Sequence, residues 1–124
     1  MILVDTSIWV DHLRVARGPL TSLLQTDLVC THVYIIGELA CGNLDKRKEL
    51  LEMLQALPRL TAATDDEVLY FIGRHKIMGR GIGYIDAHLL TATAIHSALI
   101  FTRDKRLQEI AEELGLAYPL PGKH

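Results

Sequence analysis

The sequence lacks the features that mark several classes of protein. No apolar run is long enough to cross a bilayer, and the first residues show neither the basic start nor the cleavage site of a signal peptide, so we expect a cytoplasmic protein without a membrane segment. Cysteine is scarce: Cys30 and Cys41 both lie in apolar segments, which predicts small buried thiols rather than a disulfide. The net charge of −2 argues against nucleic-acid binding through a general positive field, although a local basic patch or a metal would still permit it.

Metal ligands of the nitrogen and sulfur type are also sparse. The six histidines form no HxxxH or HxH pair, and Cys30, His32 and Cys41 have no fourth ligand at zinc-finger spacing. What the sequence does have is the composition of a compact protein, with 49% hydrophobic residues over 124 positions. We therefore expect one domain over residues 1–124, long enough to bury a core.

Short apolar runs alternate with helical patterns along the whole chain. The clearest buried strands are 2–4 and 98–102, with weaker candidates at 28–30, 60–63 and 116–118. Helices are expected at about 8–13, 20–27, 32–42, 45–57, 64–76, 84–97 and 104–114. The helix after Thr64 begins with a capping-box pattern, which pairs Thr64 with Glu67. This alternation predicts an α/β fold with a mostly parallel sheet and helices on both faces.

The first strand ends on a carboxylate. Asp5 follows three apolar residues, at the end of a parallel strand where ligands bind in open α/β sheets. Thr6 and Ser7 come next, and either hydroxyl is a candidate cap for the helix over 8–13. Asp5 by itself fits two interpretations, a turn or cap residue and a ligand.

Three more acids occupy similar positions. Asp104 follows the strand 98–102 with one residue between, Asp86 lies in the first turn of a helix, and Glu38 projects from the apolar face of another helix. If these acids converge with Asp5 at one sheet edge, their charges repel one another, and a divalent cation removes the conflict. Because all donors are oxygens, the expected ion is Mg²⁺ or Mn²⁺. Such a centre supports phosphoryl transfer by activating water and stabilising charge.

Beyond these acids, longer stretches resemble a known family. The order ILVDTS, IWVDHL, then GELACG, then GIGYIDAHLLTATAIHSALIFTRDKRL is similar to the PIN-domain ribonucleases, in particular the VapC toxins of bacterial toxin–antitoxin pairs. The resemblance covers nearly the whole chain and is strongest at the N-terminal strand and over 81–107. It implies a PIN-like three-layer fold with a parallel sheet of about five strands.

The resemblance also implies roles for particular residues. The acidic metal-binding quartet would be Asp5, Glu38, Asp86 and Asp104, and the supporting hydroxyls would be Thr102 and Thr6 or Ser7. Family members hydrolyse RNA phosphodiester bonds with Mg²⁺ or Mn²⁺, usually as homodimers, and an antitoxin partner of the VapB type blocks the site. RNA as the substrate is implied by the family and by nothing else in the sequence.

Several other residues have two interpretations each. Basic side chains near the expected site either contact phosphates or only solvate helix ends: Arg74, Lys76, Arg80, Arg103, Lys105 and Arg106. Trp9 and Tyr34 either stack on RNA bases or pack in the core or a dimer, and packing is favoured. We expect Asp11 on a solvated helix face, and His88 to be structural or on the surface. The glycines of 79–83 lack phosphate-binding spacing and are expected to let a loop move.

Two other enzyme-like classes fit poorly. A receiver domain needs an acidic pair after the first strand and a late lysine, and a haloacid-dehalogenase-type phosphatase needs an acid where this chain has Ser7. A PIN-like domain without a toxin role, either an RNA-processing nuclease or a non-catalytic interaction module, remains the alternative function.

Overall fold

The strand β1 (Ile2–Val4) is the centre of a parallel sheet, as its three apolar residues predict. It pairs with β2 (Val29–Cys30) on one side and with β3 (Leu99–Phe101) on the other. In the register of the second pair Val4 lies opposite Phe101, so both strands end at the same level. These coordinates are a computed structural model, which describes residues 1–14 and 18–119.

The prediction of about five strands is wrong in detail, because the described residues contain three strands in the order β2-β1-β3. Of the three weaker candidates, 28–30 contains β2, 116–118 forms a single parallel bridge of Ala117 with Ile100, and 60–63 adjoins a single bridge of Arg59 with Thr31. At the second of these bridges, Thr31 donates to the carbonyl of Pro58 and accepts from the N–H of Leu60, both at 2.9 Å. Each outer segment meets the sheet at one residue only, which is too short for a ladder of strand hydrogen bonds.

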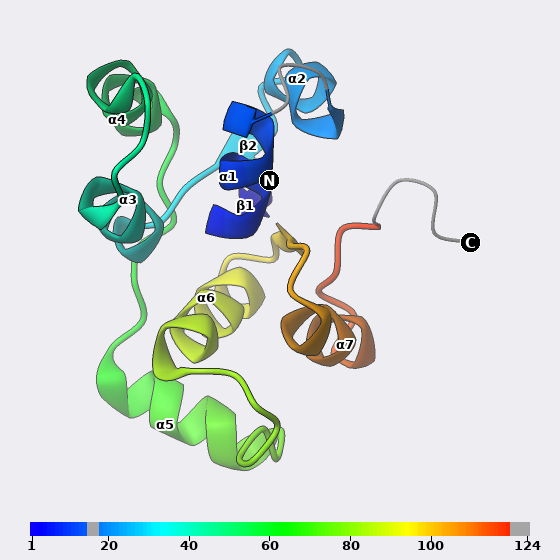
Figure 1. Cartoon of the computed structure of the whole chain (residues 1–124). Coiled ribbons are helices and arrows are strands. Elements are labelled where there is room, and N and C mark those ends of the chain that lie inside the picture. Colours follow the sequence, from blue (N-terminus) through cyan, green and yellow to red (C-terminus); the bar gives the residue numbers. More distant parts are fainter. Residues whose placement is uncertain (15–17, 120–124) are drawn as a thin grey trace.

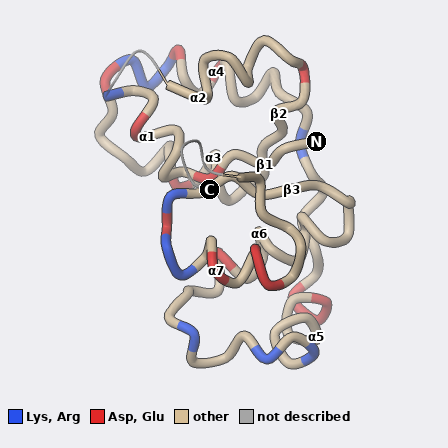
Figure 2. The backbone as a smooth tube through the Cα atoms, turned by 90° about the vertical axis from the view of Figure 1, so that its right-hand side faces the viewer, with Lys and Arg blue, Asp and Glu red and all other residues tan. Residues whose placement is uncertain are grey.

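Helices cover both faces of this sheet, as expected. Their bounds are α1 (Thr6–Arg14), α2 (Pro19–Leu24), α3 (Val33–Cys41), α4 (Arg47–Ala56), α5 (Asp65–Arg74), α6 (Tyr84–Ile95) and α7 (Lys105–Glu113). Figure 1 and, turned by 90°, Figure 2 both place α2 and α4 above the strands and α5, α6 and α7 below them. The helices after β1 and β3 therefore both start at the edge of the sheet where these strands end.

Three helix starts show how well capping could be anticipated. The capping box of α5 is present in full, with hydrogen bonds in both directions between Thr64 and Glu67. The helix α4 does not begin at Asp45 as expected, because Lys46 adopts a left-handed conformation, with φ of 56°, directly before it. The helix α1 begins at Thr6 itself, so the prediction that Thr6 or Ser7 caps it is wrong.

The core lies between the sheet and the helices. Trp9 is fully buried there, which confirms that it packs in the core and excludes it from stacking on RNA. Cys30 is buried as predicted and burial raises the pKa of its thiol to about 11. Cys41 is a free, exposed thiol, so the prediction that it is buried is wrong. Within the described residues no helix is long and apolar enough to span a membrane.

Candidate metal centre at the carboxyl edge of the sheet

Asp5 is the most deeply buried of the four acids, with 5% of its surface exposed. Its backbone N–H still belongs to the sheet, where it donates to the carbonyl of Phe101 at 2.9 Å. The oxygen Oδ2 accepts hydrogen bonds from the hydroxyls of Thr102 at 2.7 Å and Ser7 at 2.9 Å. A carboxylate buried among hydroxyl donors stays ionised at a lower cost than one among apolar groups.

The two hydroxyls also hold the chain after β3. Ser7 Oγ accepts from the N–H of Arg103 at 3.0 Å, and Thr102 Oγ1 accepts from the N–H of Asp104 at 3.1 Å. Each hydroxyl therefore links a backbone N–H to Oδ2 of Asp5. The other oxygen, Oδ1, has only a long contact of 3.4 Å from Thr6, so it is the better placed of the two to bind a cation.

Asp104 is built differently from Asp5. It is exposed and serves as the N-cap of α7, with Oδ1 accepting from the N–H of Leu107 at 3.0 Å. Capping fixes the side chain at the helix N-terminus, where the helix dipole favours a negative charge. Because Oδ1 is used for the cap, Oδ2 is the oxygen left to face a ligand.

Asp86 shows that the acids converge. The pKa of Asp86 is raised to about 6, with burial as the largest cause, although the first turn of a helix usually favours an ionised acid. Three negative charges add to this rise: Asp5, Asp104 and Glu38. The structure therefore brings the other three sequence-predicted acids, from two strand ends and one helix, within electrostatic reach of Asp86.

Glu38 lies at the rim of this cluster. Its side chain is exposed, yet partial burial raises the pKa of its carboxyl, with a further contribution from the charge of Asp5. A groove of about 460 Å³ runs beside it, lined by Tyr34, Gly37, Cys41 and Ile85. Tyr34 is half-buried at the wall of this groove rather than inside the core.

The donor set fits a hard divalent cation in chemistry and in charge. All four side chains offer carboxylate oxygens, and their mutual repulsion is what a cation would relieve. In residues 1–14 and 18–119, no three Asp, Glu, His or Cys side chains already stand in a metal-holding arrangement. The roles of these acids as ligands, and of Thr6, Ser7 and Thr102 as supports, therefore stay predictions.

The basic residues named from the sequence have mixed surroundings. Arg80 forms an ion pair with Glu113 at 2.8 Å, and Arg103 forms one with Asp11. Both pairs are partly exposed, and such pairs break at little cost when a phosphate competes. The exposed residues Arg74, at the end of α5, and Lys76, just after it, also remain candidates for RNA contact.

The glycine loop before α6 lies close to α7 at Gly81. Gly81 has φ of +85°, and a Cβ there would stand 2.7 Å from the side chain of Arg106 on α7. Together with the Arg80 pair, this close contact ties the loop to the helix that Asp104 caps. Glycine is favoured at this position because other residues would be strained at this positive φ.

A family model described as the PIN domain matches residues 2–113. The chain belongs to the PIN-domain family. This PIN domain is 44% identical over 118 residues to "Ribonuclease VapC32" of Mycobacterium tuberculosis, with the same identity in strains CDC 1551 / Oshkosh and H37Rv. The match covers 94% of this chain and 95% of the relative. The family resemblance read from the sequence is thereby confirmed.

Solved structures share this PIN fold at low sequence identity. PAE2754 from Pyrobaculum aerophilum matches with a TM-score of 0.61 and 18% identity, over 91% of this chain and 85% of that one. FitAcB from Neisseria gonorrhoeae matches with a TM-score of 0.59 and 21% identity, over 90% and 94%. At these identities the likeness shows the fold alone.

The sequence did not reveal one polar cluster beside the acids. His88, expected to be structural or on the surface, is buried and lies 3.0 Å from Asp65, which also accepts from Tyr84 at 2.7 Å. These bonds join α5 to α6, the helix that carries Asp86. The available signal was the spacing of four between Tyr84 and His88, which puts two polar rings on one helix face.

Proposed function

We propose that this PIN domain is a metal-dependent endoribonuclease that hydrolyses RNA phosphodiester bonds and acts as the toxin of a VapBC-type pair in the cytoplasm. The observation that carries the proposal is the convergence of three carboxylates, those of Asp5, Asp104 and Glu38, on Asp86, whose pKa is raised to about 6. Identity of 44% to a protein named as a ribonuclease supports the same conclusion.

The proposed roles follow from the geometry. Asp5 would offer Oδ1 to the cation, and Asp104 would offer Oδ2, because its Oδ1 caps α7. Asp86 and Glu38 would add carboxylates from α6 and α3. When bound, Mg²⁺ or Mn²⁺ would activate a water and offset the charge that develops on the phosphate. Ser7 and Thr102 donate hydrogen bonds to Asp5, and Thr102 also fixes the chain that leads to Asp104.

Cleavage of total cellular RNA with Mg²⁺, with Mn²⁺ and with EDTA tests this proposal. We expect cuts at defined positions with either cation, none with EDTA, and none from Asp104→Asn. A matched control is Glu109→Gln, an exposed acid on the same helix, which should cleave normally. Persistence of the cuts in EDTA and in Asp104→Asn would overturn the proposal. Binding without cleavage would favour the interaction-module alternative.

The toxin role has a separate test. A cognate antitoxin of the VapB type is implied by the resemblance to VapC toxins. Expression of the chain should arrest growth, and co-expression of the protein encoded beside it should restore growth. If expression arrests nothing while purified protein still cleaves RNA, the chain is an RNA-processing nuclease without a toxin role.

We further propose that the protein forms a homodimer. Large apolar side chains are exposed on adjacent helices α5 and α6: Leu69 is 59%, Tyr70 71% and Ile95 50% exposed. An apolar groove runs between them, and a surface of this kind marks an interface. Light scattering should give twice the chain mass, and Tyr70→Glu should give the monomer. A monomeric wild-type protein would contradict the dimer without affecting the nuclease proposal.

A further inference from the structure

We propose that Asp65 on α5 is a positioning residue for the metal centre, because it grips the first turn of α6 and so fixes the direction in which Asp86 points. This inference rests on the proposed nuclease function. Asp65 is exposed, and from its sequence position alone it would be only an acid at a helix N-terminus.

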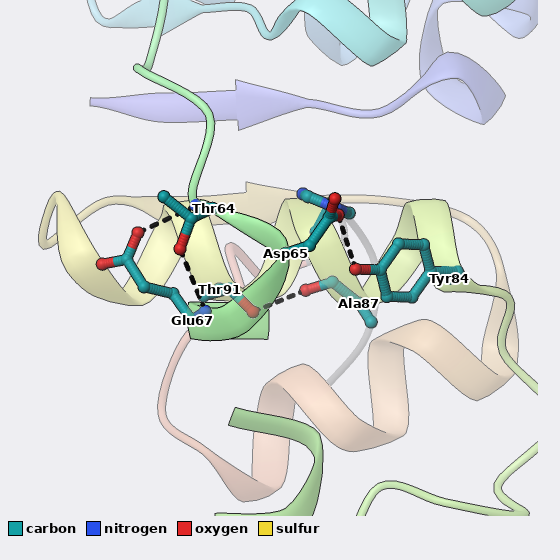
Figure 3. A network of polar contacts seen from close by, with 7 residues as sticks. Thr64, Asp65, Glu67, Tyr84, Ala87 and Thr91 are labelled. Atoms are coloured by element: carbon teal, nitrogen blue, oxygen red, sulfur yellow. Dashed lines mark hydrogen bonds and ion pairs between the residues drawn. The ribbon is translucent and has the colours of Figure 1, made fainter. Parts of the chain in front are cut away.

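The contacts of Asp65 all go to α6. Its oxygen Oδ1 accepts from the hydroxyl of Tyr84 at 2.7 Å, and Nε2 of His88 lies 3.0 Å from the same oxygen. Figure 3 shows Asp65 reaching from its helix toward Tyr84, beside the capping box of Thr64 and Glu67. Because an ionised carboxylate only accepts, both α6 side chains act as donors.

Helical geometry explains why this grip orients Asp86. Tyr84 and His88 are four residues apart and share one face of α6. Asp86 lies midway between them in sequence, which places it about 200° around the helix from each, on the opposite face. Holding the Tyr84–His88 face against α5 therefore turns Asp86 away from α5 and toward Asp5 and Asp104.

The start of α6 needs such an external hold. Its N-cap residue is Gly83, which has no side chain to make a cap hydrogen bond. The preceding loop contains three residues with positive φ: Lys76, Gly79 and Gly81. In contrast, α5 starts from a complete capping box, so Asp65 stands on a firmly fixed turn. The well-capped helix thus adds a hold on α6 to the hydrogen bond between the backbone of Gly83 and the carboxyl of Asp86.

The same cluster reaches the helix that carries Glu38. The ring of His88 makes T-shaped contacts with the ring of Tyr34 on α3 and with the ring of Tyr84, with centroids 4.9 Å and 4.8 Å apart. Tyr34 lies one helical turn before Glu38. Only 1% of His88 is exposed. Its side chain therefore packs between its own helix α6 and Tyr34 on α3, and it also contacts Asp65 on α5. Displacing His88 would therefore disturb two of the four acids.

The test is Mg²⁺ binding measured by isothermal titration calorimetry, together with the Mg²⁺ dependence of RNA cleavage. We expect Asp65→Ala to raise the dissociation constant for Mg²⁺ roughly tenfold, the lower end of the range found for groups that orient ligands. At saturating Mg²⁺ its cleavage rate should stay within about twofold of wild type, because the ligands themselves are intact. Asp65→Asn keeps an acceptor for both donors and should restore tight binding.

The matched control is Asp66→Ala, which removes the same charge from the same turn of α5. Its Mg²⁺ affinity should stay at the wild-type value, because none of the hydrogen bonds that hold the first turn of α6 involves Asp66. If Asp65→Ala does not fold, Tyr84→Phe removes one of the two bonds and should weaken Mg²⁺ binding in the same direction.

Equal Mg²⁺ affinities in Asp65→Ala and Asp66→Ala would overturn the inference, even if Asp65→Ala lowered the unfolding temperature. A wild-type protein that neither binds Mg²⁺ nor cleaves RNA would overturn the proposed function and this inference together. An active wild type with an unaffected Asp65→Ala would overturn the inference alone.

Discussion

The two acids at strand ends and the two on helices are held in opposite ways. Asp5 and Asp104 are satisfied by hydrogen bonds, from hydroxyls in one case and from a helix N–H in the other. Asp86 and Glu38 instead have raised pKa values, caused first by burial and then by neighbouring negative charge. Hydrogen bonds stabilise the first pair within the folded protein, whereas burial and repulsion penalise the charged forms of the second pair, and a bound cation would relieve that penalty.

This contrast separates function from stability. Removing a strand-end acid should destroy activity with little gain in stability, whereas removing Asp86 should destroy activity and stabilise the protein without metal. Stored electrostatic strain of this kind is typical of functional sites. The variants below test the contrast from the largest expected effect to the smallest.

Asp5→Asn should lower the cleavage rate by roughly 10²–10³-fold while the protein remains folded. The amide oxygen can take the place of Oδ2 and accept from Thr102 and Ser7, so the buried hydrogen bonds survive. The charge that a cation requires is lost. Single-turnover cleavage measures the rate, and circular dichroism shows whether the protein remains folded. A variant that loses its fold would show that Asp5 is structural first, and one that cleaves normally would show that it is no ligand.

Thr102→Val should destabilise the protein by about 2 kcal/mol, because it removes one donor to a buried carboxylate and leaves the N–H of Asp104 without its acceptor. Urea unfolding measures this loss. Thr93→Val is the matched control: its buried hydroxyl bonds the carbonyl of Leu89 within α6, so its loss should cost less than 1 kcal/mol, about the value of one neutral bond. Equal losses in the two variants would mean that Asp5 does not depend on Thr102.

Much of this contrast could be anticipated from the sequence. The apolar runs before Asp5 and Asp104 predicted two parallel strands that end at one edge, and β1 and β3 do so. Local rules were sufficient there, because strand ends and the Thr64 capping box depend on neighbours within a few residues.

The features that the sequence did not predict depend on contacts between distant segments. Whether 60–63 and 116–118 form strands is decided by how long they run beside the sheet, which a short apolar pattern does not specify. The bonds of Asp65 to α6 cross nineteen and 23 positions, and its own sequence context predicts only a helix N-terminus. Cys41 lies in an apolar segment, yet its helix turns it outward.

Asp86→Asn should raise the free energy of unfolding of the metal-free protein at about pH 8 by roughly 1–2 kcal/mol. The folded pKa of Asp86 is about 6 and its ordinary value is 3.8, so the folded state holds this proton more tightly. Its stabilising effect is complete below the ordinary value and is lost as the pH rises through about 6. The shift corresponds to about 3 kcal/mol, and we reduce it because Asp86 is partly exposed to solvent.

Urea unfolding with EDTA at a series of pH values measures this difference. It should be near zero around pH 4 and reach a plateau above pH 7. With Mg²⁺ the order should reverse, because the cation stabilises wild type more than the variant. A difference that does not change with pH would mean that Asp86 is not strained in the folded protein.

Glu38→Gln should show the smallest effect on stability. Comparing it with Asp86→Asn shows how the stability cost is divided between the two acids that lie on helices. Burial and the charge of Asp5 raise the pKa of Glu38, but its side chain is exposed, so solvent screens most of the penalty. We expect a gain within the roughly 0.5 kcal/mol usual for surface changes, in the same direction as for Asp86→Asn. If it exceeded the gain of Asp86→Asn, Glu38 rather than Asp86 would be the acid on which the repulsion of the cluster falls, and the cation would be held nearer to α3 than to the sheet.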